Sequence, residues 1–353
     1  MRAVIAGTGI DIPPITVDNH ALARIMETSD EWIRTRSGIV ERHYASPDQA
    51  SSDLAVEAAR RAMANAGTTP DGIDYLIFAT MTPDHYFPGS APPLQEKLGM
   101  PDTPCLDIRQ QCAGFVYALQ LGDALIRSGQ YRRVLLVGAE AHVMFMPWSE
   151  RTWEVVLDPE AAPLSEEERR YNTQTRDRTV LFGDGAGAVV LEAREEDGRG
   201  IIDHVLHTRG SEAKRLWVDA GGSAYRPYFH PDMYAADQHI PIVEGRKVYA
   251  LAVTLMPEVT LELLARHGLT VDDLDLVIMH QANLRINEAV QKRLGLPDEK
   301  VFNNIQRYGN TTAGTIPIAL HEAIEAGRAK PGDLVCFVGL GSGLNWGAVL
   351  CRL

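Results

Sequence analysis

GTTPDGIDYLIFA (residues 67–79) is repeated, with substitutions, as GLTVDDLDLVIMH (residues 268–280), and this repeat is the strongest indication of the fold. Both stretches begin with the glycine that ends a helical pattern and continue into a short apolar run typical of a buried strand. Further matches follow in the same order along the chain. They are LQEKLGMPD (94–102) with VQKRLGLPD (290–298), RRVLLVGAE (132–140) with GDLVCFVGL (332–340), and GAVVLEA (187–193) with GAVLCRL (347–353). Ordered matches of this kind indicate an internal duplication.

The duplication divides the chain into two α/β halves, 1–195 and 196–353. Each half reads helix, strand, helix, strand, helix, strand, strand, and we expect the two sheets to pack side by side with helices between and outside them. The N-terminal half also carries an insertion, roughly 145–178, that the C-terminal half lacks. The insertion is polar and charged, so it is either a surface excursion or a lid over a binding site.

Composition limits the possible functions. The chain has 353 residues, 45% of them hydrophobic, and a net charge of −13, which argues against nucleic acid as a partner. Its four cysteines form no CxxC pair, so we expect no metal site, no disulfide framework and a reducing, cytoplasmic location. The first residues read as a strand and not as a signal peptide, and the uncharged run 335–351 reads as two strands, so no membrane association is expected.

One cysteine stands at a position suited to chemistry. Cys112 follows a predicted strand (105–108) and precedes a predicted helix that runs to about residue 128. Free backbone N–H groups and the helix dipole stabilise a thiolate there, so we expect a lowered thiol pKa. A small buried cysteine is the alternative. The other cysteines lie in strand patterns and are assigned to the core.

Two polar residues follow strands in the second half. His280 comes directly after the run LDLVIM, and Asn310 lies in RYGNTTAGT after a strand at about 300–305. Because Cys112 occupies a matching strand end in the first half, a duplicated fold can bring the three side chains together. The glycine-rich turn at 339–347 is expected to place backbone N–H groups near the same point.

These residues resemble β-ketoacyl-acyl carrier protein synthase III, a family of the thiolase superfamily. The resemblance covers nearly the whole chain. It implies a duplicated thiolase-like fold with five layers, α/β/α/β/α, and two mixed sheets. The matching stretches are DEWIRTRSGIVERH (30–43), QCAGFVYAL (111–119), LFGDGAGAVVLE (181–192), HQANLRI (280–286), RYGNTTAG (307–314) and GSGLNWGA (341–348).

The resemblance implies a decarboxylative condensation. Cys112 would take the acyl group from an acyl-coenzyme A thioester, and a malonyl thioester carried by acyl carrier protein would lose carbon dioxide and attack it. His280 and Asn310 would donate hydrogen bonds to the thioester oxygen as negative charge builds there. Coenzyme A is then a substrate, and no metal or other cofactor is expected. A second oxyanion hole would use the N–H of Cys112 and the turn formed by Gly341, Ser342 and Gly343.

The resemblance also assigns a binding surface. Trp32, Arg36 and Arg151 would hold the nucleotide of coenzyme A, although packing in the core is an alternative for Trp32. Tyr86 and Phe87 lie in a loop that, in the family, completes the acyl pocket of the other subunit of a homodimer.

A basic patch for acyl carrier protein is expected on the helix that includes Leu284–Leu294. An acidic enzyme that meets an acidic carrier needs local positive charge, and the family docks its carrier there. A solvated helix face is the alternative. The residues of this patch are Arg285, Lys292, Arg293, Arg246 and Lys247.

Some residues differ from the common family pattern. Ser342 and Asn345 stand where glycine and threonine are common, and the segment 216–238 is long and aromatic. The starter acyl group therefore stays open, as does the choice between fatty-acid initiation and a secondary-metabolite pathway. Acyl transfer to an oxygen or nitrogen acceptor is an alternative reaction, and a noncatalytic partner subunit is a third possibility. The lack of a second cysteine in the glycine turn argues against a thiolase.

Overall fold

The computed structural model describes residues 1–195 and 198–353, and this part of the chain contains two five-stranded mixed sheets with the same strand order. In each sheet the first strand of the half lies at one edge, and the last strand pairs antiparallel with it. The other three strands run parallel to one another. The first sheet has the order β1 (Arg2–Asp11), β7 (Gly185–Arg194), β6 (Arg133–Glu140), β4 (Tyr75–Ala79) and β5 (Cys105–Ile108). The second has the order β8 (Gly200–Thr208), β14 (Asn345–Arg352), β13 (Leu334–Gly341), β11 (Leu276–Met279) and β12 (Val301–Phe302).

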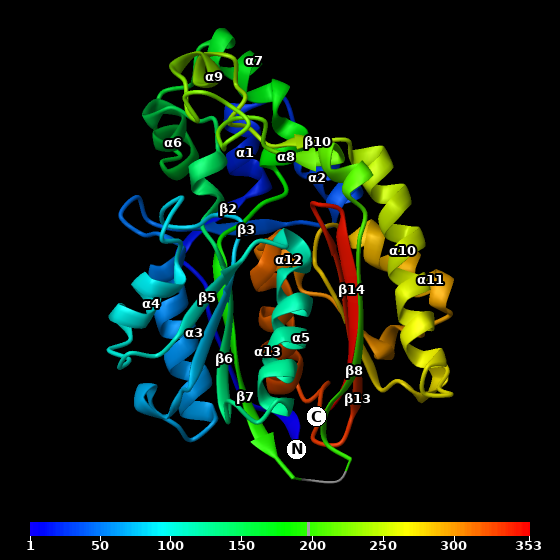
Figure 1. Ribbon diagram of the computed structural model, residues 1–353. Coiled ribbons are helices and arrows are strands. Elements are labelled where there is room, and N and C mark those ends of the chain that lie inside the picture. Colours follow the sequence, from blue (N-terminus) through cyan, green and yellow to red (C-terminus); the bar gives the residue numbers. More distant parts are fainter. Residues whose placement is uncertain (196–197) are drawn as a thin grey trace.

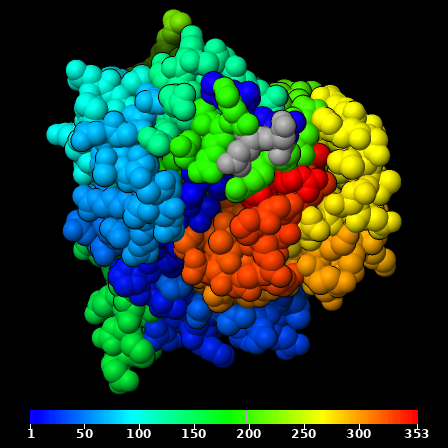
Figure 2. Space-filling model, turned by 90° about the horizontal axis from the view of Figure 1, so that it is seen from below, coloured from blue at the N-terminus to red at the C-terminus, as the bar shows by residue number. Residues whose placement is uncertain are grey.

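The two sheets and their helices form five layers. Helices α5 (Gly114–Arg127) and α13 (Thr315–Glu325) lie between the sheets and share one apolar core with both of them (Figure 1). Seen from below, the segment that contains α13 fills the centre between the two halves (Figure 2). The outer layers are α3 (Ser51–Asn65) and α4 (Ala91–Lys97) on the first sheet, and α10 (Gly245–Ala265) and α11 (Leu284–Leu294) on the second. The predicted five-layered duplicated fold is confirmed.

The central strands are buried on both faces, which explains their continuous apolar sequences. All eight residues of β13 (LVCFVGLG) are buried, as are seven of the eight in β6 (RVLLVGAE). The predicted boundary between the halves, 195/196, adjoins residues 196 and 197, which lie outside the described residues.

Helix α10 is the one described helix that is long and apolar enough to cross a membrane. One of its faces packs on the second sheet through residues such as Leu255, Val259 and Leu263. Its apolar character is therefore accounted for, at least on that face, by the protein core.

A cap covers one end of both sheets, the upper end in Figure 1. We define the cap as residues 13–50, 142–182 and 209–244. Its first segment holds β2 (Ile15–Asp18), α1 (Asn19–Ile25), α2 (Asp30–Ser37) and β3 (Glu41–Tyr44). Its second holds α6 (Glu150–Leu157), α7 (Glu166–Gln174) and α8 (Arg176–Thr179), and its third holds β9 (Leu216–Trp217), α9 (Pro231–Ala235) and β10 (Ile242–Val243).

The predicted insertion, 145–178, forms the helices of the second cap segment. Trp148, Val155 and Leu164 of the insertion share an apolar cluster with Ile25 and Tyr44 of the first segment. The insertion is therefore a packed part of the cap and not a loose surface excursion. Phe145 and Asp177 line the central cavity described below, so the insertion faces the site, as the alternative interpretation had it.

Candidate active site

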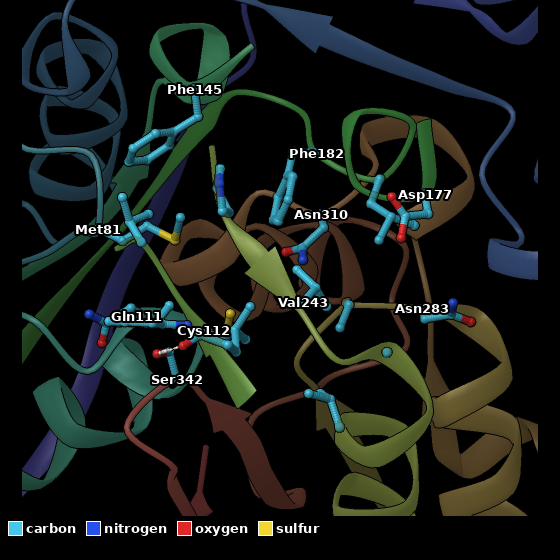
Figure 3. Close-up of a pocket in the computed structure, with 18 of the residues that line it drawn as sticks. Met81, Gln111, Cys112, Phe145, Asp177, Phe182, Val243, Asn283, Asn310 and Ser342 are labelled. Carbon is cyan, nitrogen blue, oxygen red and sulfur yellow. Dashed lines mark hydrogen bonds between the residues drawn. The ribbon is translucent and has the colours of Figure 1, made fainter. Parts of the chain in front are cut away.

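The three residues singled out in the sequence line one cavity beneath the cap. Cys112 lies in the short turn between β5 and α5, His280 directly follows β11, and Asn310 follows α12 (Ile305–Tyr308). The cavity has a volume of about 1380 Å³, and all three side chains line it. Figure 3 shows Cys112, Asn310 and Ser342 around it, with Phe145 and Phe182 above them. The strand ends of the two halves thus meet at one point.

The Cys112 thiol is buried, with 7% of the residue exposed. Burial raises the pKa of this thiol to about 12, and the nearby Glu140 carboxylate acts in the same direction. The cysteine's own N–H and the Thr312 hydroxyl oppose that shift without reversing it. The expectation of a lowered pKa was therefore wrong, because desolvation outweighs the hydrogen-bond donors near the thiol. The thiol needs a base when it reacts.

Glu140, at the end of β6, was missed in the sequence. Its buried carboxylate accepts hydrogen bonds from the N–H groups of Met81 and Thr82 and from the hydroxyls of Thr80 and Thr82. Burial raises its pKa in spite of these donors. Glu140 is the last residue of a buried strand, and that strand ends on the same side of the sheet as the strand before Cys112. This position is the signal that could have revealed it.

His280 presents an unprotonated nitrogen to the cavity. Thr315 Oγ1 donates its single proton to the Thr312 carbonyl oxygen (2.8 Å), so it must accept from His280 Nδ1, which lies 2.7 Å away. Burial lowers the pKa of His280 to about 3, which keeps the ring neutral. Nε2 then carries a lone pair, and it has no hydrogen-bond partner in the part of the chain that the structure describes.

Asn310 presents the opposite kind of group, a free donor. Its Oδ1 accepts the N–H of Thr312 at 2.8 Å, which assigns the other end of the amide, Nδ2, as the end that carries protons. Nδ2 makes no hydrogen bond to any described residue. The site therefore combines a thiol, an unpaired base and an unpaired amide donor.

The glycine turn approaches Cys112 closely. A side chain at Gly341 would come within 2.8 Å of the Cys112 backbone nitrogen, so only glycine fits there. Ser342 lines the cavity, and its hydroxyl donates to the Leu216 carbonyl oxygen of the cap. Gly343 is not among the lining residues and faces Asn345 instead.

Trp32 lines the cavity, and two guanidinium groups lie over its ring. Arg36 lies over its ring at 4.4 Å and Arg176 at 4.7 Å. Arg151 does not lie over this ring: it pairs with Glu154 at 2.6 Å and donates to the Ala162 carbonyl oxygen. The arginine that joins Arg36 over the indole comes from α8, at the end of the insertion.

The loop after β4 is strongly exposed. Tyr86 lines the cavity and lies 5.4 Å from Tyr228 of the cap, with the Arg109 guanidinium 5.5 Å from its ring. Phe87 is 82% exposed and is not among the residues that line the cavity.

The predicted basic residues surround the same mouth or lie on the helices beside it. Arg285 and Arg246 line the cavity, and Lys292 is exposed on α11. Arg293 donates to the Val253 carbonyl oxygen and so holds α11 against α10. Lys247 pairs with Glu244 at 2.5 Å.

The duplicated fold, with a cysteine, a histidine and an asparagine at strand ends meeting in one cavity, defines a thiolase-like protein. Two family domains match the chain: 3-oxoacyl-[acyl-carrier-protein] synthase III over residues 106–162 and 165–210, and its C-terminal domain over residues 264–353. The chain belongs to the 3-oxoacyl-[acyl-carrier-protein] synthase III family, also called β-ketoacyl-[acyl-carrier-protein] synthase III.

Individual relatives agree with this family over the full length of the chain. The β-ketoacyl-[acyl-carrier-protein] synthase III of Symbiobacterium thermophilum is 42% identical over 348 residues, 99% of this chain and 97% of the relative. The crystal structure of the Aquifex aeolicus synthase III has a TM-score of 0.84 at 38% identity, covering 99% of this chain and 100% of that one. The priming β-ketosynthase of the R1128 polyketide pathway has a TM-score of 0.83 at 28% identity, covering 99% and 96%.

Proposed function

We propose that this protein condenses an acyl-coenzyme A starter with a malonyl thioester carried by acyl carrier protein, through an acyl-Cys112 intermediate. The observation that carries the proposal is the single cavity that holds the Cys112 thiol, the unpaired His280 Nε2 and the unpaired Asn310 Nδ2 in a member of this family. The test is release of carbon dioxide from a malonyl thioester together with a β-ketoacyl product that contains both acyl groups. An acylated product without carbon dioxide release would overturn the proposal.

In the first half of the reaction the Cys112 sulfur attacks the starter thioester and coenzyme A leaves. A thiolate is a good nucleophile and a good leaving group, so the acyl group is held in a form that can be transferred again. The negative oxygen of the tetrahedral intermediate would face the Cys112 N–H and the turn at Ser342, which the close approach of Gly341 brings together.

In the second half the malonyl thioester loses carbon dioxide, and the resulting enolate attacks the acyl-cysteine. Asn310 Nδ2 already carries protons and can donate a hydrogen bond to the enolate oxygen without any change of protonation. His280 Nε2 becomes a donor only after it gains a proton, and the negative malonyl group beside it favours that proton uptake. The condensation takes up one proton in total, which ends on the Cys112 sulfur when the product leaves.

Coenzyme A binding is expected to depend on Arg176 and not on Arg151. We propose that Trp32, Arg36 and Arg176 together hold the nucleotide of coenzyme A, because both guanidinium groups lie close over the indole ring. Trp32→Ala and Arg176→Ala should each raise the KM for acyl-coenzyme A about tenfold with little change in kcat. Arg151→Ala is the matched control and should leave KM unchanged. A larger effect for Arg151 than for Arg176 would contradict this assignment.

We propose that acyl carrier protein docks at the mouth beside α10 and α11. Arg246, Arg285 and Lys292 form no ion pair with the described residues, so their charge is available to an acidic partner. The reversal Arg285→Glu should raise the KM for malonyl-acyl carrier protein about tenfold and leave the KM for malonyl-coenzyme A, where that donor is accepted, nearly unchanged. Equal effects on both donors would place Arg285 in the coenzyme A site instead.

We propose a homodimer in which the loop carrying Tyr86 and Phe87 reaches the partner's acyl pocket. The support is a phenylalanine that is 82% exposed next to a tyrosine at the mouth of the cavity. Sedimentation equilibrium should give twice the mass of one chain at micromolar concentration. A monomer that is fully active at the same concentration would rule out a partner's contribution to the site.

A further inference from the structure

Ser342 and Asn345, the two residues of the glycine turn that differ from the common family pattern, contact each other. The Asn345 amide nitrogen Nδ2 donates to the Ser342 carbonyl oxygen at 2.6 Å. A carbonyl oxygen only accepts, so this contact fixes which end of the amide carries the protons. The other end, Oδ1, accepts the hydroxyl proton of Thr208 at 2.8 Å. Asn345 is only 8% exposed, so both ends of a buried amide are paired.

The second sheet holds Asn345 between the turn and β8. Asn345 is the first residue of β14, and it pairs with Gly341 of β13 on one side and with Thr208 of β8 on the other. Side chains of paired residues lie on the same face of a sheet, which is why the Thr208 hydroxyl reaches the amide. Two backbone hydrogen bonds between Arg209 and Leu344, of 2.8 and 3.2 Å, join the turn to the same strand end. The turn is therefore anchored to β8.

Gly343 makes room for the Asn345 amide. It has φ +136°, and a Cβ at this position would come within 2.1 Å of Asn345 Nδ2. Any side chain at residue 343 would push the amide away from the Ser342 carbonyl oxygen. Glycine at 343 and asparagine at 345 therefore belong to one arrangement.

The Ser342 hydroxyl ties the turn to the wall of the cavity. It donates its single proton to the Leu216 carbonyl oxygen in β9, so this proton is not available to a substrate. Leu216 and Trp217 line the cavity, and β9 pairs with β10, whose Val243 lines it too. The donor that Ser342 has left is its backbone N–H, which forms no hydrogen bond with the described residues.

We propose that the side chains of Ser342 and Asn345 position the Ser342 N–H for acyl transfer to Cys112, where it receives the negative oxygen of the tetrahedral intermediate. The proposal rests on the function proposed above, in which Cys112 is acylated. Gly341, the residue before Ser342, touches the Cys112 backbone and so brings Ser342 next to the nucleophile (Figure 3). Asn345 holds the carbonyl group of Ser342, and Leu216 holds its hydroxyl, so the direction of its N–H is fixed.

The same serine sets the distance between the cavity wall and this donor. A starter acyl group that packs against Leu216 and Trp217 meets a wall that is bonded directly to the turn. Displacing a catalytic donor by about 1 Å can lower a rate about 100-fold. Loss of either side-chain contact is therefore expected to slow the first half of the reaction, although neither side chain touches the reacting atoms.

Three variants test this role by two readouts. Asn345→Asp keeps the shape but sets an acceptor against the Ser342 carbonyl oxygen, Ser342→Ala removes only the hydroxyl, and Ser342→Thr retains it. The readouts are the single-turnover rate of acyl-enzyme formation, followed by intact mass, and the rate of Cys112 alkylation by iodoacetamide, which forms no tetrahedral oxyanion. Asn345→Asp should slow acylation about 30-fold and Ser342→Ala about tenfold, with an unchanged alkylation rate. Ser342→Thr should retain acylation within about threefold.

A merely structural role gives a different result. Parallel loss of acylation and alkylation would overturn the positioning role, as would acylation slowed less than twofold in Ser342→Ala, whether or not Asn345→Asp folds. Carbon dioxide release from a malonyl thioester without a starter should stay at the wild-type rate, because His280 and Asn310 are unchanged. If the wild-type protein forms no acyl-enzyme, the proposed function fails; if it does and the variants match it, only the positioning role fails.

Discussion

Replacing Cys112 with alanine is expected to abolish the acyl-enzyme and to lower condensation at least about 1,000-fold. The expectation follows from the position of this thiol, which lies in the cavity beside the unpaired groups of His280 and Asn310. The other cysteines are Cys336 and Cys351, buried in strands, and Cys105 in β5; none of them lines the cavity. Loss of the acyl-enzyme is measured by intact mass after incubation with acyl-coenzyme A. Loss of condensation is measured by product formation with a malonyl donor.

Cys105→Ala is the matched control, because Cys105 begins the strand that leads to Cys112 and is only partly buried. It should form the acyl-enzyme at the wild-type rate. The Cys112→Ala protein should still release carbon dioxide slowly from a malonyl thioester, since His280 and Asn310 remain. An acyl adduct of undiminished yield on Cys112→Ala would show that another residue carries the acyl group.

His280→Ala and Asn310→Ala are each expected to lower condensation by about 100- to 1,000-fold while Cys112 still becomes acylated. Each variant removes one of the two unpaired groups that face the cavity, the His280 Nε2 and the Asn310 Nδ2. The rate of carbon dioxide release from the malonyl thioester should fall in parallel with product formation. Acylation should persist, because the Cys112 thiol itself stays in the cavity in both variants.

His321→Ala provides a histidine control outside the site. His321 lies in α13, bonds to Thr8 at 2.9 Å and does not line the cavity, so its loss should leave condensation nearly unchanged. Normal product formation by either His280→Ala or Asn310→Ala would remove that residue from the mechanism. Loss of acylation in both variants would show that the two half-reactions share one base.

The fold was predictable because the duplication is visible in short apolar strands such as LIFA and LVIM. Both strands are buried on two faces, so their composition is constrained and survives divergence. The convergence of Cys112, His280 and Asn310 was predictable for a related reason. In two copies of one unit, corresponding strands end on the same side of their sheets. The central helices pack against both sheets and so hold these strand ends close together.

The contacts between the residues that surround the site could not be predicted from their spacing in the sequence. Thr312 forms a hydrogen bond with His142, which lies 170 residues away in the sequence. A left-handed backbone at Thr312 could not be predicted either, because threonine does not favour that conformation. The sign of the Cys112 pKa shift could not be predicted either, because it depends on how deeply the thiol is buried and on the charge of the neighbouring Glu140 carboxylate. A helix start is visible in a sequence, whereas the depth of burial is not.

Arg151 shows how an insertion defeats transfer of a residue by position. In the folded cap Arg176 lies over Trp32 and Arg151 pairs with Glu154, and nothing in the spacing of the sequence signals this arrangement. The aromatic segment of residues 216–238 was noticed, but its role in closing the cavity needed the pairing of β9 with β10 and the bond from Ser342 to Leu216.

The most direct test of the central claim is the intact mass of the protein after incubation with a panel of acyl-coenzyme A thioesters, followed by a malonyl donor. We predict a gain equal to one acyl group on Cys112, and loss of that gain when malonyl-acyl carrier protein is added, with release of carbon dioxide and a β-ketoacyl product. An acyl group that stays on the enzyme with malonyl donors but moves to a hydroxyl or amine acceptor would contradict condensation. No gain with any coenzyme A or carrier-bound donor would contradict Cys112 as the nucleophile.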